Sequence, residues 1–119
     1  MCYHNSMNMI EINVKSEGQT VSQALGEMEI EIDRCKFAKI PILKVVHGYG
    51  SHGVGGVIKV ELHKRLRSLK SQGKIKDFIP GEKWIDSNPA KRIAINLCSD
   101  LLTRSELNML NYGVTVIIV

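Results

Sequence analysis

The sequence predicts an α/β fold, a two-layer sandwich with a parallel crossover, and three observations predict it. Segments with strand patterning alternate with segments of helical periodicity from residue 9 to residue 79. The run Ile42 to Val46 is apolar apart from Lys44, as in a strand covered on both faces. A last apolar segment, Val114 to Val119, has the pattern of a strand. We therefore expect the order strand, helix, strand, helix, strand, followed by a helical insertion before a C-terminal strand.

The first strand and the first helix follow from residues 9–35. Met9 to Val14 alternates between two faces, so one face of this strand should be buried. Thr20 and Gln23 have the spacing of a capping box, and apolar residues then recur at helical intervals as far as Cys35. Because the next strand follows soon after, we expect a right-handed parallel crossover between the two strands.

The second helix is predicted over Val54 to Lys70, where apolar residues regain helical spacing. Gln72-Gly73 ends this helix, and Ile75 to Ile79 is predicted as a third strand. One domain is expected over residues 1–119, with its core at about 9–80 and 113–119 and an insertion at about 82–112.

The insertion is predicted to be helical. Asn88-Pro89 is a preferred pair for a helix N-cap and first turn, and apolar residues spaced by four continue to Leu101. The segment Thr103 to Glu106 has the pattern of a cap for another short helix. Trp84 is expected to pack this insertion onto the rest of the domain, although an exposed tryptophan would also suit an unpaired base.

Composition and charge limit the class of protein. The three cysteines, Cys2, Cys35 and Cys98, are far apart and form no Cys-x-x-Cys pair, which indicates a reducing compartment and argues against a structural zinc site. No apolar run is long enough to span a membrane, so we expect a soluble cytoplasmic protein. The net charge is +4, and the segment from residue 59 to residue 76 holds seven basic residues against one acidic residue. This uneven charge predicts an anionic partner.

A glycine-rich loop follows the second strand and is the main candidate site. Glycines expose backbone N–H groups, and the helix that follows adds the positive end of its dipole, so the loop is suited to bind an anion. The predicted contacts in the loop are His47, Gly48, Tyr49, Gly50, Ser51, His52 and Gly53. A stripe along the second helix extends them with Lys59, His63, Arg67 and Lys70, which indicates a polyanion, although a solvated basic face has the same pattern.

Two nucleotide-binding motifs have glycine-rich loops that can be compared with this one. Gly48 to Gly53 satisfies Gly-x-Gly-x-x-Gly, but a dinucleotide fingerprint belongs to the first strand of a larger sheet and needs an acidic residue after the second. A phosphate-binding Walker loop is excluded, because no Gly-Lys-Ser or Gly-Lys-Thr follows. The glycines therefore predict an anion site of another kind.

His47-Gly48-Tyr49-Gly50 resembles the His-Gly-x-Gly motif of the small MutS-related (Smr) domain, a compact α/β domain of DNA-repair and RNA-processing proteins. The order of elements, Thr20-Val21 at the first helix and the terminal segment Gly113-Val-Thr-Val support the resemblance. It covers residues 9–80 and 113–119. The resemblance implies a domain that binds nucleic acid, and several members of the family are weak nicking endonucleases.

The other family motif, Leu-Asp-Leu-His-Gly, falls on Val14-Lys15-Ser16-Glu17-Gly18. Lys15 replaces the acidic residue, and an ammonium group repels a cation and accepts no hydrogen bond, so this departure argues against hydrolysis. The remaining catalytic candidates are His47 as a general acid or base and Glu17 as a base. No metal ligands are assigned, and a divalent ion would be needed only if the chain is a nuclease.

Three functions remain open from the sequence. The leading hypothesis is nucleic-acid binding, to DNA or RNA, through the loop and the basic stripe. The first alternative is a structure-selective nicking endonuclease that uses His47. The second is a module that binds a small anion or an acidic segment of a protein partner on the same loop.

Overall fold

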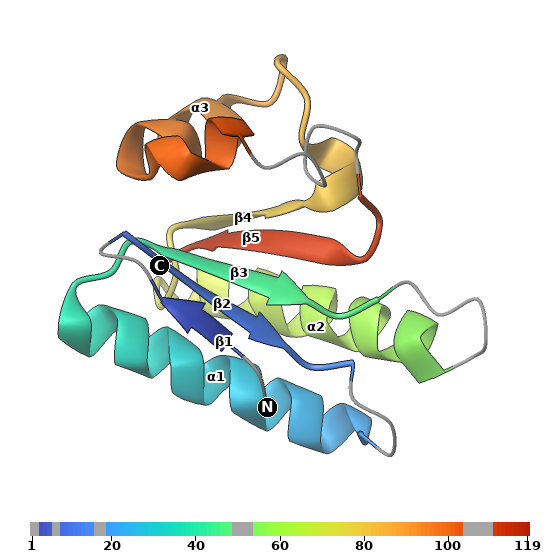
Figure 1. Ribbon diagram of the computed structural model, residues 1–119. Coiled ribbons are helices and arrows are strands. Elements are labelled where there is room, and N and C mark those ends of the chain that lie inside the picture. Colours follow the sequence, from blue (N-terminus) through green and yellow to red (C-terminus); the bar gives the residue numbers. More distant parts are fainter. Residues whose placement is uncertain (1–2, 6–7, 16–18, 49–53, 104–110) are drawn as a thin grey trace.

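The computed structural model describes residues 3–5, 8–15, 19–48, 54–103 and 111–119. A five-stranded sheet forms its centre, with strand order β1-β2-β3-β5-β4 (Figure 1). Strands β2 and β3 are parallel, and β5 lies antiparallel between β3 and β4. The strands are β1 (Tyr3–Asn5), β2 (Met9–Asn13), β3 (Ile42–Val46), β4 (Asp77–Pro80) and β5 (Val114–Ile118).

Helices cover both faces of this sheet. Helix α1 (Val21–Ala38) and helix α2 (Val54–Ser71) lie on one face, and helix α3 (Pro89–Leu97) lies on the other (Figure 1). Two short 3-10 helices flank α3, η1 (Gly81–Lys83) before it and η2 (Ser99–Thr103) after it. The predicted α/β class is confirmed, and the segment between β4 and β5 adds a helical layer to the predicted sandwich.

Helix α1 begins and ends where its local sequence dictates. The Thr20 hydroxyl accepts from the Gln23 N–H at 3.1 Å, and the Gln23 side chain accepts from the Thr20 N–H at 3.0 Å. This is the predicted capping box, which satisfies two backbone donors at once. At the other end Lys39 adopts a left-handed conformation, and its N–H donates to carbonyls of the last turn.

Each face of the sheet has its own hydrophobic core. The core under α1 and α2 contains Ile12, Leu43 and Ile117 from the sheet, against residues such as Met28 and Leu62 from the helices. The opposite core contains sheet residues that point the other way, against the segment between β4 and β5: Met9, Ile42, Ile79, Val114, Val116, Ile118, Trp84, Ala90, Ala94, Cys98 and Leu101. Strand β3 is buried on both sides, and its residues are apolar except Lys44, whose buried ammonium pairs with Glu11 at 2.9 Å.

Trp84 packs as the sequence predicted, because only 2% of its surface is exposed in this second core. Two boundaries differ from the prediction. Strand β4 starts at Asp77 rather than Ile75, since Asp77 pairs with Ile118, the last residue of β5. Helix α3 ends at Leu97, because Cys98 has an extended backbone.

Strand β1 was not predicted, and its place at the edge of the sheet comes from antiparallel pairing with β2. Most of the predicted short helix that starts at Thr103 lies outside the described residues. Within the described part of the chain, none of the helices combines the length and hydrophobicity that a membrane span requires.

Candidate functional site

The carboxyl ends of β2 and β3 meet the start of β5 at the base of the glycine-rich loop. The Val14 N–H donates to the Val46 carbonyl at 2.9 Å, which holds the first two strands together at this end. The N–H groups of His47 and Gly48 both donate to the Gly113 carbonyl, at 2.9 and 3.0 Å. Gly48 has a φ of +71°, a conformation that favours glycine. The chain therefore turns sharply out of the sheet at this residue.

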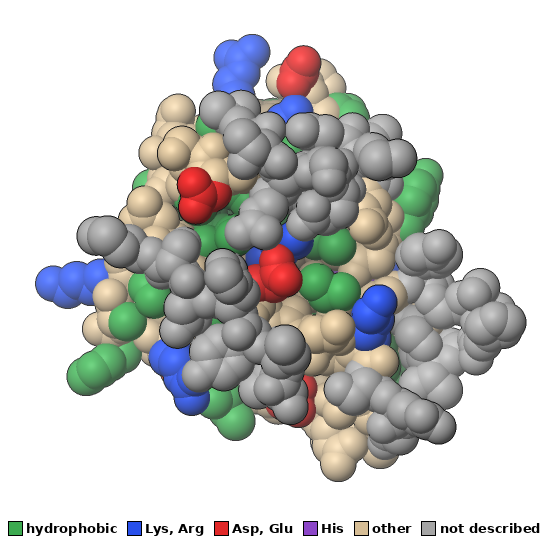
Figure 2. Space-filling view, in the orientation of Figure 1, with side chains coloured by type: hydrophobic (Ala, Val, Ile, Leu, Met, Phe, Trp, Pro, Cys, Tyr) green, Lys and Arg blue, Asp and Glu red, His purple; other side chains and the backbone are tan. Residues whose placement is uncertain are grey.

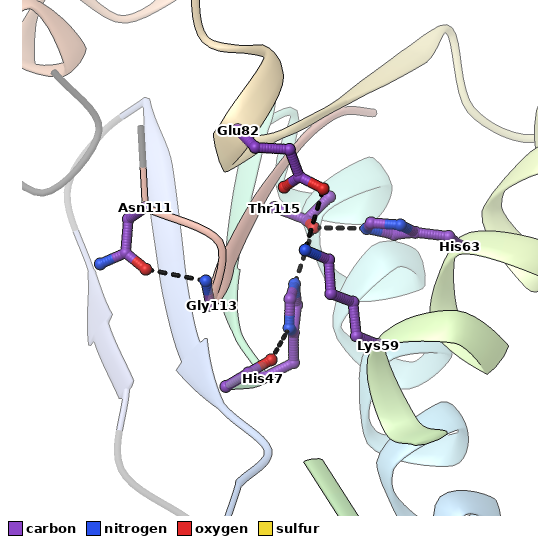
Figure 3. Close-up of polar contacts among 8 residues, drawn as sticks. His47, Lys59, His63, Glu82, Asn111, Gly113 and Thr115 are labelled. Carbon is purple, nitrogen blue, oxygen red and sulfur yellow. Dashed lines mark hydrogen bonds and ion pairs between the residues drawn. The ribbon is translucent and has the colours of Figure 1, made fainter. Parts of the chain in front are cut away.

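The His47 side chain is fully buried at this turn. Its Nδ1 lies 2.5 Å from the Gly48 carbonyl oxygen, and its Nε2 lies 2.8 Å from the Thr115 hydroxyl (Figure 3). A carbonyl oxygen only accepts, so Nδ1 carries the proton. Burial lowers the pKa of His47 to about 4, which keeps the ring neutral. Nε2 is then an acceptor, and the Thr115 hydroxyl donates to it.

His63 on α2 reaches the same hydroxyl from the other side. Its Nε2 lies 2.8 Å from Thr115 Oγ1 (Figure 3). Burial also lowers the pKa of His63, so this ring is neutral at physiological pH as well. Since the Thr115 proton points to His47, the Thr115 oxygen accepts from His63 Nε2–H. Three hydrogen bonds thus run in one direction, from His63 through Thr115 and His47 to Gly48.

An ion pair lies beside this chain of hydrogen bonds. Lys59 Nζ is 2.9 Å from Glu82 Oε2, and both side chains are largely buried (Figure 3). Burial raises the pKa of Glu82, but hydrogen bonds from the Lys59 ammonium and from the backbone outweigh it and hold the pKa below its usual range. Lys59 Nζ also lies 5.1 Å from the centre of the Tyr112 ring. Lys59 is therefore committed to partners within the chain.

A groove of about 620 Å³ opens between α2 and the segment that runs from β4 to the start of α3, and we call it the α2 groove. It holds three cationic side chains against one carboxylate, Asp77, which pairs with Lys70 at 3.0 Å. Among the described residues no carboxylate forms an ion pair with Arg67 or Lys83. The lining residues are His63, Arg67, Lys70, Ser71, Asp77, Phe78, Pro80, Lys83, Asn88 and Ala90.

Charged side chains are dispersed on the face of the molecule that Figure 2 shows. On this face basic and acidic side chains form no large patch of one charge and are separated by apolar and neutral ones. None of the described histidines is visible on that face. The α2 groove, by contrast, brings cations from two separate segments together around one hollow.

Comparison with known proteins gives the family. A sequence profile of the Smr domain family matches residues 17–84, more than half of the chain. This chain belongs to the Smr domain family. The crystal structure of the Smr domain of Thermus thermophilus MutS2 matches with a TM-score of 0.54, over 91% of this chain and 94% of that chain. The sequence identity is 20%, so this likeness shows the fold alone. Among curated proteins no match was found.

The residues predicted for the site of this Smr domain divide into four groups. His63, Arg67 and Lys70 line the α2 groove together, whereas Lys59 lies apart in its ion pair with Glu82. His47 is at the base of the loop, with both ring nitrogens engaged. Outside the described residues lie the loop residues Tyr49, Gly50, Ser51, His52 and Gly53, together with Glu17.

Lys15, which replaces the acidic residue of the first family motif, lies beside the loop base. A Cβ atom built on Gly48 would be 3.7 Å from Lys15 Cδ, so the two residues are neighbours at the ends of β2 and β3. Within the described ranges, no cluster of three histidine, cysteine or acidic side chains has the arrangement of a metal site.

Sequence reasoning missed three residues of this site. Lys83 and Asn88 reach the α2 groove from the segment after β4. Thr115 joins the two histidines, and the sequence contains a pattern that points to it. It is the one polar residue in the otherwise apolar run from Val114 to Val119, and a buried hydroxyl needs a hydrogen-bond partner.

Proposed function

We propose that this Smr domain binds nucleic acid, with phosphates of the backbone held in the α2 groove. One observation carries the proposal: Arg67, Lys70 and Lys83 converge on a single hollow, although they come from two separate segments. Arginine and lysine at close quarters neutralise phosphates and release the counterions that surround a nucleic acid. The groove therefore matches a polyanion better than it matches an isolated small anion.

The three cations differ in how free they are to bind. Arg67 is exposed, and its planar guanidinium can bind a phosphate through two parallel hydrogen bonds. Lys83 is also exposed. Lys70 shares its charge with Asp77, so part of its attraction for a phosphate is already used. We expect Arg67 to contribute most to the affinity.

The floor and rim of the groove support the same function. Phe78 and Pro80 give the groove apolar surface, against which a sugar or a base edge can pack. Phe78 also lies beside His63, with ring centres 5.7 Å apart. Cations at the rim with apolar surface between them suit a flexible nucleic-acid strand, whose charges lie outside and whose bases are apolar on their faces.

The loop from Gly48 to Gly53 remains a proposed second contact, because its glycines and the helix that follows it suit an anion. His47 supports that loop from within. Its ring is buried and neutral, and both nitrogens are already hydrogen-bonded, so in this arrangement it holds the turn rather than a phosphate. The resemblance to nicking endonucleases also implies strand cleavage, and this stays a prediction. In the arrangement described, His47 does not supply a catalytic group for it.

A titration of labelled oligonucleotides by fluorescence anisotropy, at several salt concentrations, tests the binding proposal. The logarithm of the affinity should fall linearly with the logarithm of the salt concentration. Arg67→Gln should weaken binding and reduce that slope by about 0.7 to 0.9. The same reactions, run on gels with and without magnesium or manganese, score strand cleavage.

Arg65→Gln is the matched control, because it removes the same charge from the same helix. Arg65 lies on the side of α2 that faces α1, where it pairs with Glu29 at 3.2 Å, away from the groove. This variant should bind like the wild type. Wild-type protein that fails to bind at about 50 mM salt, or equal losses in the two variants, would overturn the proposal.

A further inference from the structure

The direction of the hydrogen bonds between the two histidines is fixed at one end. The Gly48 carbonyl can only accept, so His47 Nδ1 must donate to it and His47 Nε2 must accept from Thr115. A threonine hydroxyl has one proton, and that proton is now used. His63 Nε2 must therefore donate to the Thr115 oxygen, at 2.8 Å.

This direction decides which nitrogen of His63 is free. In a neutral imidazole one nitrogen carries the proton and the other carries the lone pair. With the proton on Nε2, the lone pair of His63 is on Nδ1. No described group donates a hydrogen bond to Nδ1, and His63 is a lining residue of the α2 groove. The buried network thus presents a neutral acceptor to a ligand in the groove.

The other polar groups of the groove are mostly donors or are already engaged. The side chains of Arg67, Lys70 and Lys83 carry donors only. The Asn88 side-chain oxygen accepts from the Ala90 N–H at 3.0 Å.

Asp77 is another source of acceptors. Its Oδ1 accepts from Lys70 Nζ at 3.0 Å and from the Phe78 N–H at 2.8 Å. The acceptors to consider are then the second Asp77 oxygen, His63 Nδ1 and the oxygen of Ser71, whose hydroxyl donates to the Ser68 carbonyl at 2.9 Å. A carboxylate repels a phosphate, whereas a neutral nitrogen does not.

We infer that the α2 groove prefers RNA to DNA, because His63 Nδ1 accepts a hydrogen bond from a ribose 2′-hydroxyl. A phosphate backbone carries acceptors, and the 2′-hydroxyl is the donor that RNA has and DNA lacks. The cations of the groove bind the phosphates of either polymer, and His63 adds a contact that only RNA can make. This inference rests on the proposed function and names the class of nucleic acid that the same groove takes.

The test compares three single-stranded oligonucleotides of one sequence: RNA, DNA and 2′-O-methyl RNA. The methylated strand keeps the bases and the 2′ oxygen but has lost the donor, so it separates the hydroxyl from contacts to base amino groups. RNA should bind about 5- to 10-fold more tightly than either of the others, the value of one hydrogen bond. Equal binding of all three would overturn the RNA preference and leave the proposed function standing, whereas no binding of any would overturn both.

Variants assign the preference to one atom. His63→Phe keeps a ring beside Phe78 but removes Nδ1, so the ratio of RNA to DNA affinity should fall toward one. Arg67→Gln should weaken RNA and DNA alike and leave the ratio unchanged. If Asp77→Asn abolishes the ratio and His63→Phe does not, the carboxylate is the acceptor and the inference is wrong.

Nitrogen-15 NMR of the histidine side chains gives a readout that does not depend on binding. At pH 7.5 His63 should show a protonated Nε2 and a bare Nδ1, and His47 should show the opposite tautomer. On addition of RNA, but not of DNA, the Nδ1 resonance of His63 should move toward the value of a hydrogen-bonded nitrogen. A proton on His63 Nδ1 in the free protein would overturn the inference.

Discussion

Replacing Thr115 by valine removes one oxygen atom and tests the hydrogen-bond chain directly. Valine has nearly the same shape as threonine and suits a strand, so the substitution leaves no cavity and keeps the backbone of β5. What changes is that His47 Nε2 loses its donor and His63 Nε2–H loses its acceptor. Thr115 is 1% exposed and His47 is fully buried, so water cannot readily replace the hydroxyl at His47.

The two losses differ in size. A buried acceptor without a partner costs about 1–3 kcal/mol, which applies to His47. His63 is partly exposed at the groove, so water can take over part of its bond, and we expect about 1 kcal/mol there. Thr115→Val should therefore lower the free energy of unfolding by about 2–4 kcal/mol. With an unfolding entropy of roughly 0.25 kcal/mol/K for 119 residues, Tm should fall by about 8–16 °C.

Urea unfolding at pH 7.5, followed by circular dichroism, measures this effect. Thr115→Ser is the control, because serine keeps the hydroxyl and loses one methyl group, at a cost of about 1 kcal/mol. An amide NMR spectrum of each variant shows whether the native fold persists. The reasoning is refuted if the valine variant is as stable as the wild type, or if serine destabilises more than valine.

Three further predictions concern stability. Burial lowers the pKa of His47 from 6.5 to about 4. Between these two pH values the unfolded chain binds a proton that the folded chain does not. The folded protein should therefore lose about 3 kcal/mol of stability as the pH falls from 6.5 to 4. The lowered pKa of His63 changes the stability in the same direction. Urea midpoints that stay constant from pH 7 to pH 5 would contradict this prediction. Gly81→Ala should destabilise by about 3 kcal/mol or more, since a Cβ there would lie 1.8 Å from the Asn111 carbonyl oxygen. Gly26→Ala in α1, where a Cβ meets nothing within 4 Å, should instead stabilise by about 0.5–1 kcal/mol, and urea unfolding measures both glycine variants.

Local sequence predicted most elements of the fold. The capping box of α1, the alternation of β2 and the mostly apolar run of β3, interrupted by Lys44, each depend on residues a few positions apart, and the structure has all three. The helical spacing of His63, Arg67 and Lys70 placed these side chains on one flank of α2 for the same reason. Periodicity indicates which residues share a face of a helix or strand, and a short stretch of sequence is enough to show it.

Only the tertiary structure decided what each face meets. Thr115 is 68 residues from His47 and 52 residues from His63, so no local pattern could join the three. Lys83 and Asn88 complete the α2 groove because the segment after β4 folds back beside α2. The sequence alone determined that this chain has a basic helix flank and a glycine-rich loop at the end of a buried strand. Long-range packing decided that His47 is buried and neutral, because desolvation depends on neighbours that the chain supplies from distant positions.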